Sequence, residues 1–399
     1  MWATIRDGIW HSLVDAQCPL LGKDSRALSG VPPLLQGAGP RRTPAASEHP
    51  RIPAGALLAA AALVLVTVIP APAQSIMSLQ QTTGFVYTAD EVGNSISAIN
   101  LATGQIAIVP TTVSPHNIQV TADGARLLVV GDPKFEAGGH DVGKTGEGKM
   151  AAGSLLIFST ANLASGPVAT ISVGDHPAHV VTDRRGVHAY VTLSGENVVA
   201  VIDLSRNEIV RKIPTGRYPH GLRISPIGHA VYVANVEDGS VSVIDIATLA
   251  EVARVPIGKG PVQVGFTPDG SRAYVSLRDE NKVAVIDTMT MAVLARIDVG
   301  RNPIQLHASR DGRFVYVANQ GTKTEPADTV SVIDTATAKV VDTIRTGAGA
   351  HGVAISRDGR FVFVTNIIAG TVSAIDIESR SVTATFTVGR GPNGITYRP

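Results

Sequence analysis

A marker residue that recurs about every 42 residues constrains the fold of this chain more than any other feature. It stands at the centre of a short apolar segment. The marker positions are Tyr87, Val129, Tyr190, Tyr232, Tyr274, Tyr316 and Phe363. An insertion widens the step between Val129 and Tyr190, and the series defines seven repeats.

The stretch 230–272 displays the repeating unit most clearly. It contains four segments rich in Val and Ile, which are AVYVAN, SVSVID, EVARVPIG and VQVGFT. Apolar or alternating runs bounded by Gly, Asp, Asn and Pro are typical of β-strands. Four-stranded units that cannot bury both faces alone are satisfied by a closed ring around a channel. We therefore expect an all-β fold, a seven-bladed β-propeller of four-stranded antiparallel blades.

The two ends of the repeat array complement each other. No counterpart of VQVGFT precedes Phe85, whereas the C-terminus supplies an additional one, GPNGITYRP. We expect this C-terminal strand to join the N-terminal blade and close the ring, which removes an open sheet edge. The propeller is therefore predicted over residues 85–399, with a loop insertion over 133–153.

The segments VYVAN, VFVTN and SVSVID, together with the Asp-Gly turns, carry a family resemblance. The chain resembles the YVTN family of seven-bladed β-propellers, the YncE-like proteins of the bacterial cell envelope. The resemblance covers residues 85–399 and implies the propeller fold. It implies less about function, because YVTN-type propellers have varied roles and some bind nucleic acid.

The N-terminal part of the chain differs from the repeats. Residues 1–53 lack periodicity, so we expect a disordered extension or an overextended gene start. Residues 54–73 combine an apolar run with the small residues APA, which predicts a signal peptide cleaved after Ala73. A membrane anchor is the alternative, but the run is shorter than the roughly 20 residues that span a bilayer. Cleavage would remove Cys18, the only cysteine, and leave a periplasmic or secreted protein with no membrane span.

Most repeated aspartates are expected to stabilise turns by accepting hydrogen bonds from backbone amides. Those that end the SVSVID-type segments are Asp203, Asp245, Asp287, Asp334 and Asp376. Those in Asp-Gly hairpin turns are Asp269, Asp311 and Asp358.

Candidate site residues lie on the loops that enter the innermost strands. These loops share one end of the propeller with the loops between second and third strands, and loops on a rigid ring often carry binding groups. Four of them place a histidine beside the strand start: His116, His179, His220 and His351. In ring order the four occupy one continuous arc. His179 is offset by one position, which predicts that it points away from the others.

Acidic and polar residues extend this candidate site. Asp90 and Asp132 stand on the same arc, where other repeats carry Asn. The insertion 133–153, with His140 and Asp141, is expected to form a flap over the channel mouth. Further candidate ligand-binding residues are Asn117, Tyr218, Gln263, Gln305 and Asn393.

Neutral imidazoles and carboxylates that converge on one mouth are typical ligands of zinc or copper. The same groups can act as general base and acid. The structural alternative is that each histidine bonds backbone groups near its strand start. The sequence contains no HExxH or CxxC motif, so the metal prediction rests on ring geometry.

Three functions are compatible with these features. The first is a periplasmic binding or scaffold protein whose mouth takes a ligand, a metal or an envelope protein. The alternatives are a metal-dependent enzyme, since similar propellers include lactonases and lyases, and a copper or zinc carrier. Basic and acidic side chains are nearly equal in number and both tryptophans precede residue 54, which argues against nucleic acid as the partner. We expect a monomer.

Overall fold

The computed structural model describes residues 67–69, 82–134 and 152–399. The predictions for residues 1–53, for most of the signal peptide and for His140 and Asp141 lie outside these described residues. Within the described part of the chain, no helix has the length and apolar character needed to cross a membrane.

Seven antiparallel sheets make up the described structure, one for each sequence repeat, and we call them blades 1 to 7. Blade 1 contains β2 (Phe85–Asp90), β3 (Ser95–Asn100), β4 (Ile106–Pro110) and β29 (Pro392–Arg398), with β1 (Thr67–Ile69) at its outer edge. Blade 2 contains β5 (Val113–Val120), β6 (Arg126–Pro133), β7 (Gly153–Ser159) and β8 (Ala169–Gly174). Blade 3 contains β9 (Pro177–Thr182), β10 (His188–Leu193), β11 (Val198–Asp203) and β12 (Glu208–Pro214).

The remaining four blades follow the same strand order from the channel outward. Blade 4 contains β13 (Pro219–Ile224), β14 (Ala230–Asn235), β15 (Ser240–Asp245) and β16 (Ala250–Pro256). Blade 5 contains β17 (Pro261–Phe266), β18 (Arg272–Leu277), β19 (Lys282–Asp287) and β20 (Val293–Asp298). Blade 6 contains β21 (Pro303–Ala308), β22 (Phe314–Gly321), β23 (Pro326–Asp334) and β24 (Lys339–Arg345). Blade 7 contains β25 (Ala350–Ile355), β26 (Phe361–Asn366), β27 (Thr371–Asp376) and β28 (Ser381–Thr387). Two short 3₁₀ turns are η3 (Leu163–Ser165) and η4 (Arg278–Glu280).

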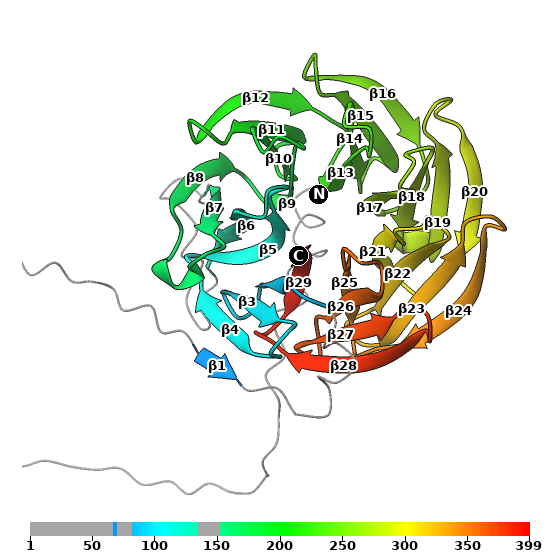
Figure 1. Cartoon of the computed structure of the whole chain (residues 1–399). Coiled ribbons are helices and arrows are strands. Elements are labelled where there is room, and N and C mark those ends of the chain that lie inside the picture. The colour runs from blue at the N-terminus through cyan, green and yellow to red at the C-terminus, as the bar shows by residue number, and fades with distance from the viewer. Residues whose placement is uncertain (1–66, 70–81, 135–151) are drawn as a thin grey trace, which may run out of the picture. The chain divides into compact units, whose positions relative to one another are not determined.

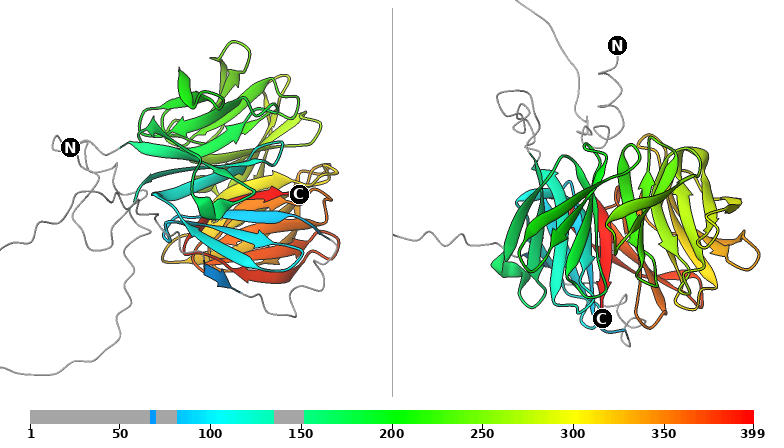
Figure 2. Two further views of the ribbon diagram at one scale, coloured as in Figure 1. Left: turned by 60° about the vertical axis from the view of Figure 1, so that its left-hand side comes forward. Right: turned by 90° about the horizontal axis from the view of Figure 1, so that it is seen from above.

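The blades form a closed ring, as the sequence predicted. Figure 1 looks along the central channel, and the two views in Figure 2 show the blades from other sides. The innermost strands are, in ring order, β29, β5, β9, β13, β17, β21 and β25. Strand β29 pairs antiparallel with β2, so the C-terminal strand completes blade 1.

Blade 1 has an additional strand at its outer edge. In β1, Thr67 pairs with Ile108 and Ile69 pairs with Ile106 of β4. These three residues fall within the predicted signal peptide, so cleavage after Ala73 would remove this fifth strand.

Apolar side chains pack between neighbouring blades and form the core. One cluster joins Val86 and Ile99 of blade 1 to Phe363 of blade 7. The marker tyrosines Tyr190 and Tyr316 are fully buried, and burial raises the pKa of both hydroxyls to about 12. The inner three strands of each sheet are buried on both faces, whereas outermost strands such as β16 and β20 alternate between exposed and buried or half-buried residues.

The turn aspartates have the predicted structural roles. Asp245 Oδ1 accepts the backbone N–H of Thr248 at 2.7 Å. In an Asp-Gly hairpin, Asp269 Oδ1 accepts the backbone N–H of Ser271 at 3.1 Å. These contacts repeat in the other blades and fix the ends of the propeller on which the site is built.

Candidate metal site in the channel

A register shift in the innermost strands determines which side chains face the channel. In β9, the two residues Ala178 and His179 lie opposite a single residue of β10, Thr192. Strand β5 has its shift at His116, and β13 has one that includes His220. A bulge of this kind bends the strand and redirects side chains. Three consecutive blades therefore carry a histidine at an irregular position near the start of the inner strand.

His116, His179 and His220 converge, and we call them the histidine cluster. The Nε2 atoms of His116 and His220 lie 3.2 Å apart. The ring centroid of His179 lies 5.8 Å from that of His116 and 4.7 Å from that of His220. One ring nitrogen from each histidine lies within 4.8 Å of the other two. The prediction that His179 points away is wrong, because the bulge in β9 directs it to the same place.

The ring orientation of His220 is fixed by the neighbouring blade. Its Nδ1 lies 3.2 Å from the carbonyl oxygen of Val262, which can only accept a hydrogen bond. Nδ1 therefore carries the proton, and Nε2 of the neutral ring presents a lone pair toward His116. Metal-binding histidines commonly donate from the second nitrogen in this way, since the bond selects the tautomer.

Burial keeps two members of the cluster neutral. His179 and His220 are each 1% exposed. Burial, reinforced by the neighbouring imidazoles, holds the pKa of both rings well below the usual value. Unprotonated imidazole is the form that binds a metal ion, so both rings are ready to act as ligands near neutral pH.

Glu91 orients His116 and was not predicted from the sequence. Its Oε1 lies 3.2 Å from His116 Nδ1, and its Oε2 accepts a 2.7 Å hydrogen bond from Asn393 Nδ2. Burial alone would raise the pKa of Glu91, but His116 and Asn393 outweigh it and the pKa is lowered. Nδ1 of His116 thus lies between the Glu91 carboxylate, which can accept its hydrogen bond, and the Asn393 amide nitrogen at 3.1 Å. A sequence signal was present, because Glu91 is acidic where the loops of blades 3 and 4 have Ser194 and Val236.

These contacts leave one position for a shared proton or a cation inside the cluster. Nε2 of His220 presents its lone pair to Nε2 of His116 at 3.2 Å, because Nδ1 of His220 faces a carbonyl oxygen. Either a proton on His116 Nε2 or a cation between the two nitrogens satisfies this contact. Zn–N bonds of 2.0–2.1 Å in tetrahedral geometry separate two ligand nitrogens by about 3.3 Å, which matches the observed spacing. Nε2 of His179 is buried and has no hydrogen-bond partner among the described residues.

His351 is not part of the cluster. It is 2% exposed, and its Nδ1 lies 3.2 Å from the carbonyl oxygen of Asn393. Burial, reinforced by the neighbouring His116, lowers its pKa to about 4. Of the four predicted histidines, the structure thus brings three together within ligand distance and leaves His351 on the neighbouring arc.

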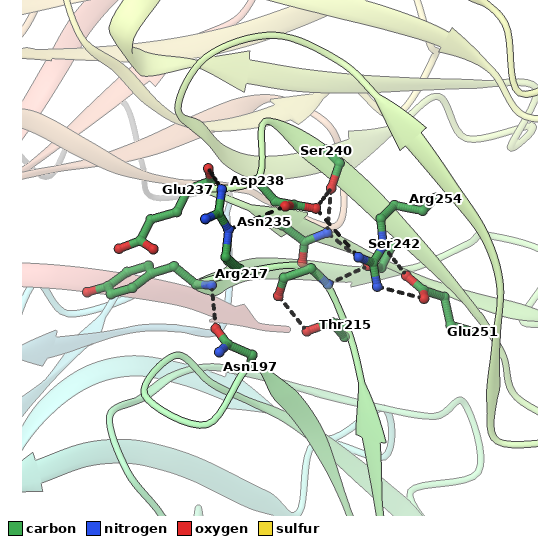
Figure 3. A network of polar contacts seen from close by, with 12 residues as sticks. Asn197, Thr215, Arg217, Asn235, Glu237, Asp238, Ser240, Ser242, Glu251 and Arg254 are labelled. Carbon is green, nitrogen blue, oxygen red and sulfur yellow. Dashed lines mark hydrogen bonds and ion pairs between the residues drawn. The ribbon is translucent and has the colours of Figure 1, made fainter.

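The predicted carboxylate Asp90 has a structural environment and is not brought to the cluster. It is fully buried and accepts hydrogen bonds from Thr88 Oγ1 and Ser97 Oγ, both at 2.6 Å. Burial raises its pKa to about 7. In blade 4 the same place is occupied by Asn235, which donates to two serines in the network of Figure 3. Asp90 therefore anchors the turn of blade 1, and the carboxylate beside the cluster comes from Glu91.

Asp132 also lies outside the cluster. Its Oδ2 is 2.9 Å from Nδ1 of His176, whose side chain is 45% exposed. This pair is at the surface of the propeller end, where an exposed ion pair contributes little to stability. The structure therefore does not place Asp132 among the metal-ligand candidates.

The predicted amide residues surround the histidines in different ways. Asn117 Oδ1 accepts the backbone N–H of Val180 at 3.3 Å and links blade 2 to blade 3. Gln263 Nε2 lies 3.5 Å from His179 Nδ1, across the channel. Gln305 Nε2 and Asn393 Oδ1 are buried without a hydrogen-bond partner among the residues described. These polar atoms make the mouth of the channel capable of holding an ordered ligand.

Tyr218 occupies the loop before β13. Its backbone is in the left-handed region, with φ of 56°, and its N–H donates to Asn197 Oδ1 at 2.8 Å. The surrounding loop network includes Arg217 and Asp238 (Figure 3). These contacts fix the loop of blade 4 at the same end of the propeller as the histidine cluster.

Two family models match parts of the chain. The YNCE-like beta-propeller matches residues 157–310, and the Cytochrome D1 heme domain matches residues 270–390. Together with the seven four-stranded blades, the first match supports a YncE-like seven-bladed β-propeller. The resemblance inferred from the sequence is thereby confirmed. No curated protein gives a significant match.

Solved structures support the fold. A chain of Kuenenia stuttgartiensis hydrazine synthase is 19% identical with a TM-score of 0.59, over 71% of this chain and 89% of that one. A protein of unknown function from Desulfotomaculum acetoxidans DSM 771 is 18% identical with a TM-score of 0.64, over 79% of this chain and 99% of that one. At such identities the likeness concerns the fold alone.

Proposed function

We propose that this propeller protein binds a divalent transition metal ion, zinc or copper, through His116, His179 and His220. One observation carries the proposal: a ring nitrogen of each histidine lies within 4.8 Å of the other two. The facing Nε2 atoms of His116 and His220 and the fixed tautomer of His220 support it. Imidazole is a preferred ligand of both metals.

The proposed setting is the bacterial cell envelope. The apolar run in residues 54–73 supports export, and the only cysteine, Cys18, precedes the proposed cleavage site. A metal centre made of histidines does not depend on thiols and suits an oxidising compartment. In this proposal the protein binds its metal, a ligand or an envelope partner at the mouth of the channel without turning over a substrate.

Elemental analysis of the full chain, purified without chelator, tests the metal site. The wild type should carry about one zinc or copper ion per chain. The His116→Ala/His220→Ala double variant should carry none. A matched control is His188→Ala/His229→Ala, which removes two histidines from the opposite end of blades 3 and 4. Equal metal content in the wild type and the cluster variant would refute the proposal.

A metal-dependent enzyme is the second candidate. Three protein ligands leave a fourth position of a tetrahedral ion open to water or substrate, as in catalytic zinc sites. A hydrolase or lyase of the lactonase type would use that position. A panel of lactones and esters, assayed with the metal-loaded wild type and with His116→Ala, distinguishes the two candidates. Metal-dependent turnover that the variant loses would favour the enzyme.

The residues described do not fit a haem, although one family model is named for a haem domain. The rings of the histidine cluster lie 4.7–5.8 Å from one another across the channel mouth, which leaves no space for a macrocycle between them. The cavity at the other end of the channel measures about 280 Å³, below the usual range even for drug-sized ligands. We therefore derive no step through a haem.

A further inference from the structure

The end of the channel away from the histidine cluster contains a cavity. It has a volume of about 280 Å³ and lies between the final residues of the inner strands. Arg223, the residue three places after His220 in β13, lines it together with His307 of β21 and Arg310. Three residues of strand span roughly 10 Å, so this cavity is separate from the metal site.

The charge around this cavity is unbalanced. Its lining includes the side chains of Arg223, His307 and Arg310 but no aspartate or glutamate. Arg223 is half-buried and makes no hydrogen bond or ion pair with any residue in the described ranges. Desolvation lowers its pKa to about 10. A partly desolvated guanidinium without a partner costs free energy, and an anionic ligand would offset that cost.

The neighbouring arginine and imidazole groups can bind the same kind of ligand. Arg310 donates through Nε to the carbonyl oxygen of Ser356 at 3.3 Å, which orients its guanidinium at the cavity edge. His307 Nδ1 lies 2.9 Å from the carbonyl oxygen of Ala308, so its other nitrogen is left for the cavity side. Two guanidinium groups and an imidazole can together bind an oxyanion through several charge-assisted hydrogen bonds.

The apolar residues of the lining indicate what the remainder of the ligand, beyond its anionic group, would contact. Most of the exposed wall is polar, and a smaller apolar part is contributed by the edges of Val181, Ile224, Val353, Ile355 and Ile395, most of which are otherwise packed in the core. We propose that this end of the channel binds a small organic anion, with its oxyanion group on Arg223 and Arg310 and its apolar body against these side chains. This site goes beyond the metal site and does not depend on it.

Calorimetric titration of the full, metal-free chain with benzoate and with inorganic phosphate tests the proposal. Benzoate should bind once per chain and more tightly than phosphate, which has no apolar body. Arg223→Gln should weaken benzoate binding about tenfold or more. Arg211→Gln is the matched control, because it removes the same charge from an exposed position on outer strand β12. The His116→Ala/His220→Ala variant should bind benzoate like the wild type.

Thermal unfolding separates a binding role from a structural one. In buffer without anions, Arg223→Gln should melt at a higher temperature than the wild type, because it removes an unpaired, desolvated charge. Benzoate should raise the melting temperature of the wild type and not that of the variant. If Arg223→Gln misfolds, Arg310→Gln provides a second test of the same loss of binding. Three results would overturn the proposal: no saturable binding of benzoate, tighter binding of phosphate than of benzoate, or benzoate binding by Arg223→Gln and Arg310→Gln that equals that of the wild type.

Discussion

The Nδ1 atom of His220 lies 3.2 Å from the carbonyl oxygen of Val262, and the two residues are 42 positions apart. His351 makes the same 3.2 Å contact with Asn393, also 42 positions away. The same contact thus occurs twice in the propeller: Nδ1 of a histidine faces a carbonyl oxygen of the next inner strand, which fixes the orientation of the ring. His220 enters the cluster because His116 and His179 lie beside it, whereas His351 is followed by a blade that carries Asn393.

His351→Ala should leave the metal content of the protein unchanged. Its ring nitrogens are not among those that lie within 4.8 Å of one another in the cluster. The variant should bind about one metal ion per chain, with an affinity within a few-fold of the wild type, measured by competition with a chromophoric chelator. Loss of the metal in this variant would make His351 a ligand and would require the cluster to rearrange on binding.

Glu91→Gln should weaken metal binding about 10–100-fold without unfolding the protein. The carboxylate lies 3.2 Å from His116 Nδ1 and holds that imidazole in the orientation that presents Nε2. Glu237→Gln is the control, because Glu237 is an exposed residue at the same end of the propeller, in blade 4 (Figure 3). This substitution should leave the metal affinity unchanged. The Co²⁺ absorption spectrum should shift in the Glu91 variant, since the ligand field changes. Unaltered affinity and spectrum would remove Glu91 from the site.

Asp90→Asn should stabilise the protein above pH 7. The folded-state pKa of about 7 exceeds the ordinary value of 3.8, so the unfolded state ionises first. Stability that is fully present below about pH 4 is therefore lost as the pH rises through 7. An amide has no such loss, and Asn235 already bonds the serines of its own blade from this position. The free energy of unfolding at pH 8 should rise by about 1–3 kcal/mol.

Denaturant unfolding of wild type and Asp90→Asn at pH 5 and pH 8 measures this effect. Burial lowers the pKa of His307 and of His351 to about 4, which makes stability rise with pH between about 4 and 6.5. The wild type and Asp90→Asn share this histidine-dependent rise of stability with pH. The difference between their free energies of unfolding therefore reports on Asp90 alone. A difference that is the same at both pH values would show that Asp90 is not titrating.

The ring of blades could be predicted from spacing alone. Tyr190, Tyr232 and Tyr274 recur at a fixed interval because each blade presents the same buried position to its neighbour. The arc of histidines followed from the same regularity, since equivalent positions of successive inner strands lie side by side. Periodic sequence therefore determined both the fold and the neighbourhood of the site.

The details of the site depend on departures from that regularity. The direction of His179 depends on a bulge, which the sequence pattern does not mark. Asp90 and Glu91 are adjacent in sequence, but the Asp90 carboxylate lies inside the blade against Ser97, and the Glu91 carboxylate lies beside His116. Arg223 and His307 share no local motif and come together only because β13 and β21 end at the same cavity. Sequence reasoning located the mouth of the channel and missed these contacts.

The closure of the ring can be tested at Ile395 in β29. This side chain is 5% exposed and packs with Phe363 and Val86, so it joins blade 7 to blade 1. Ile395→Ala should reduce the free energy of unfolding by about 2–4 kcal/mol, because it leaves a cavity at the seam. Ile227→Ala, at a position that is 63% exposed, should change it by less than about 0.5 kcal/mol. Denaturant unfolding of both variants provides the measurement, and similar values for the two would mean that β29 contributes little to closing the propeller.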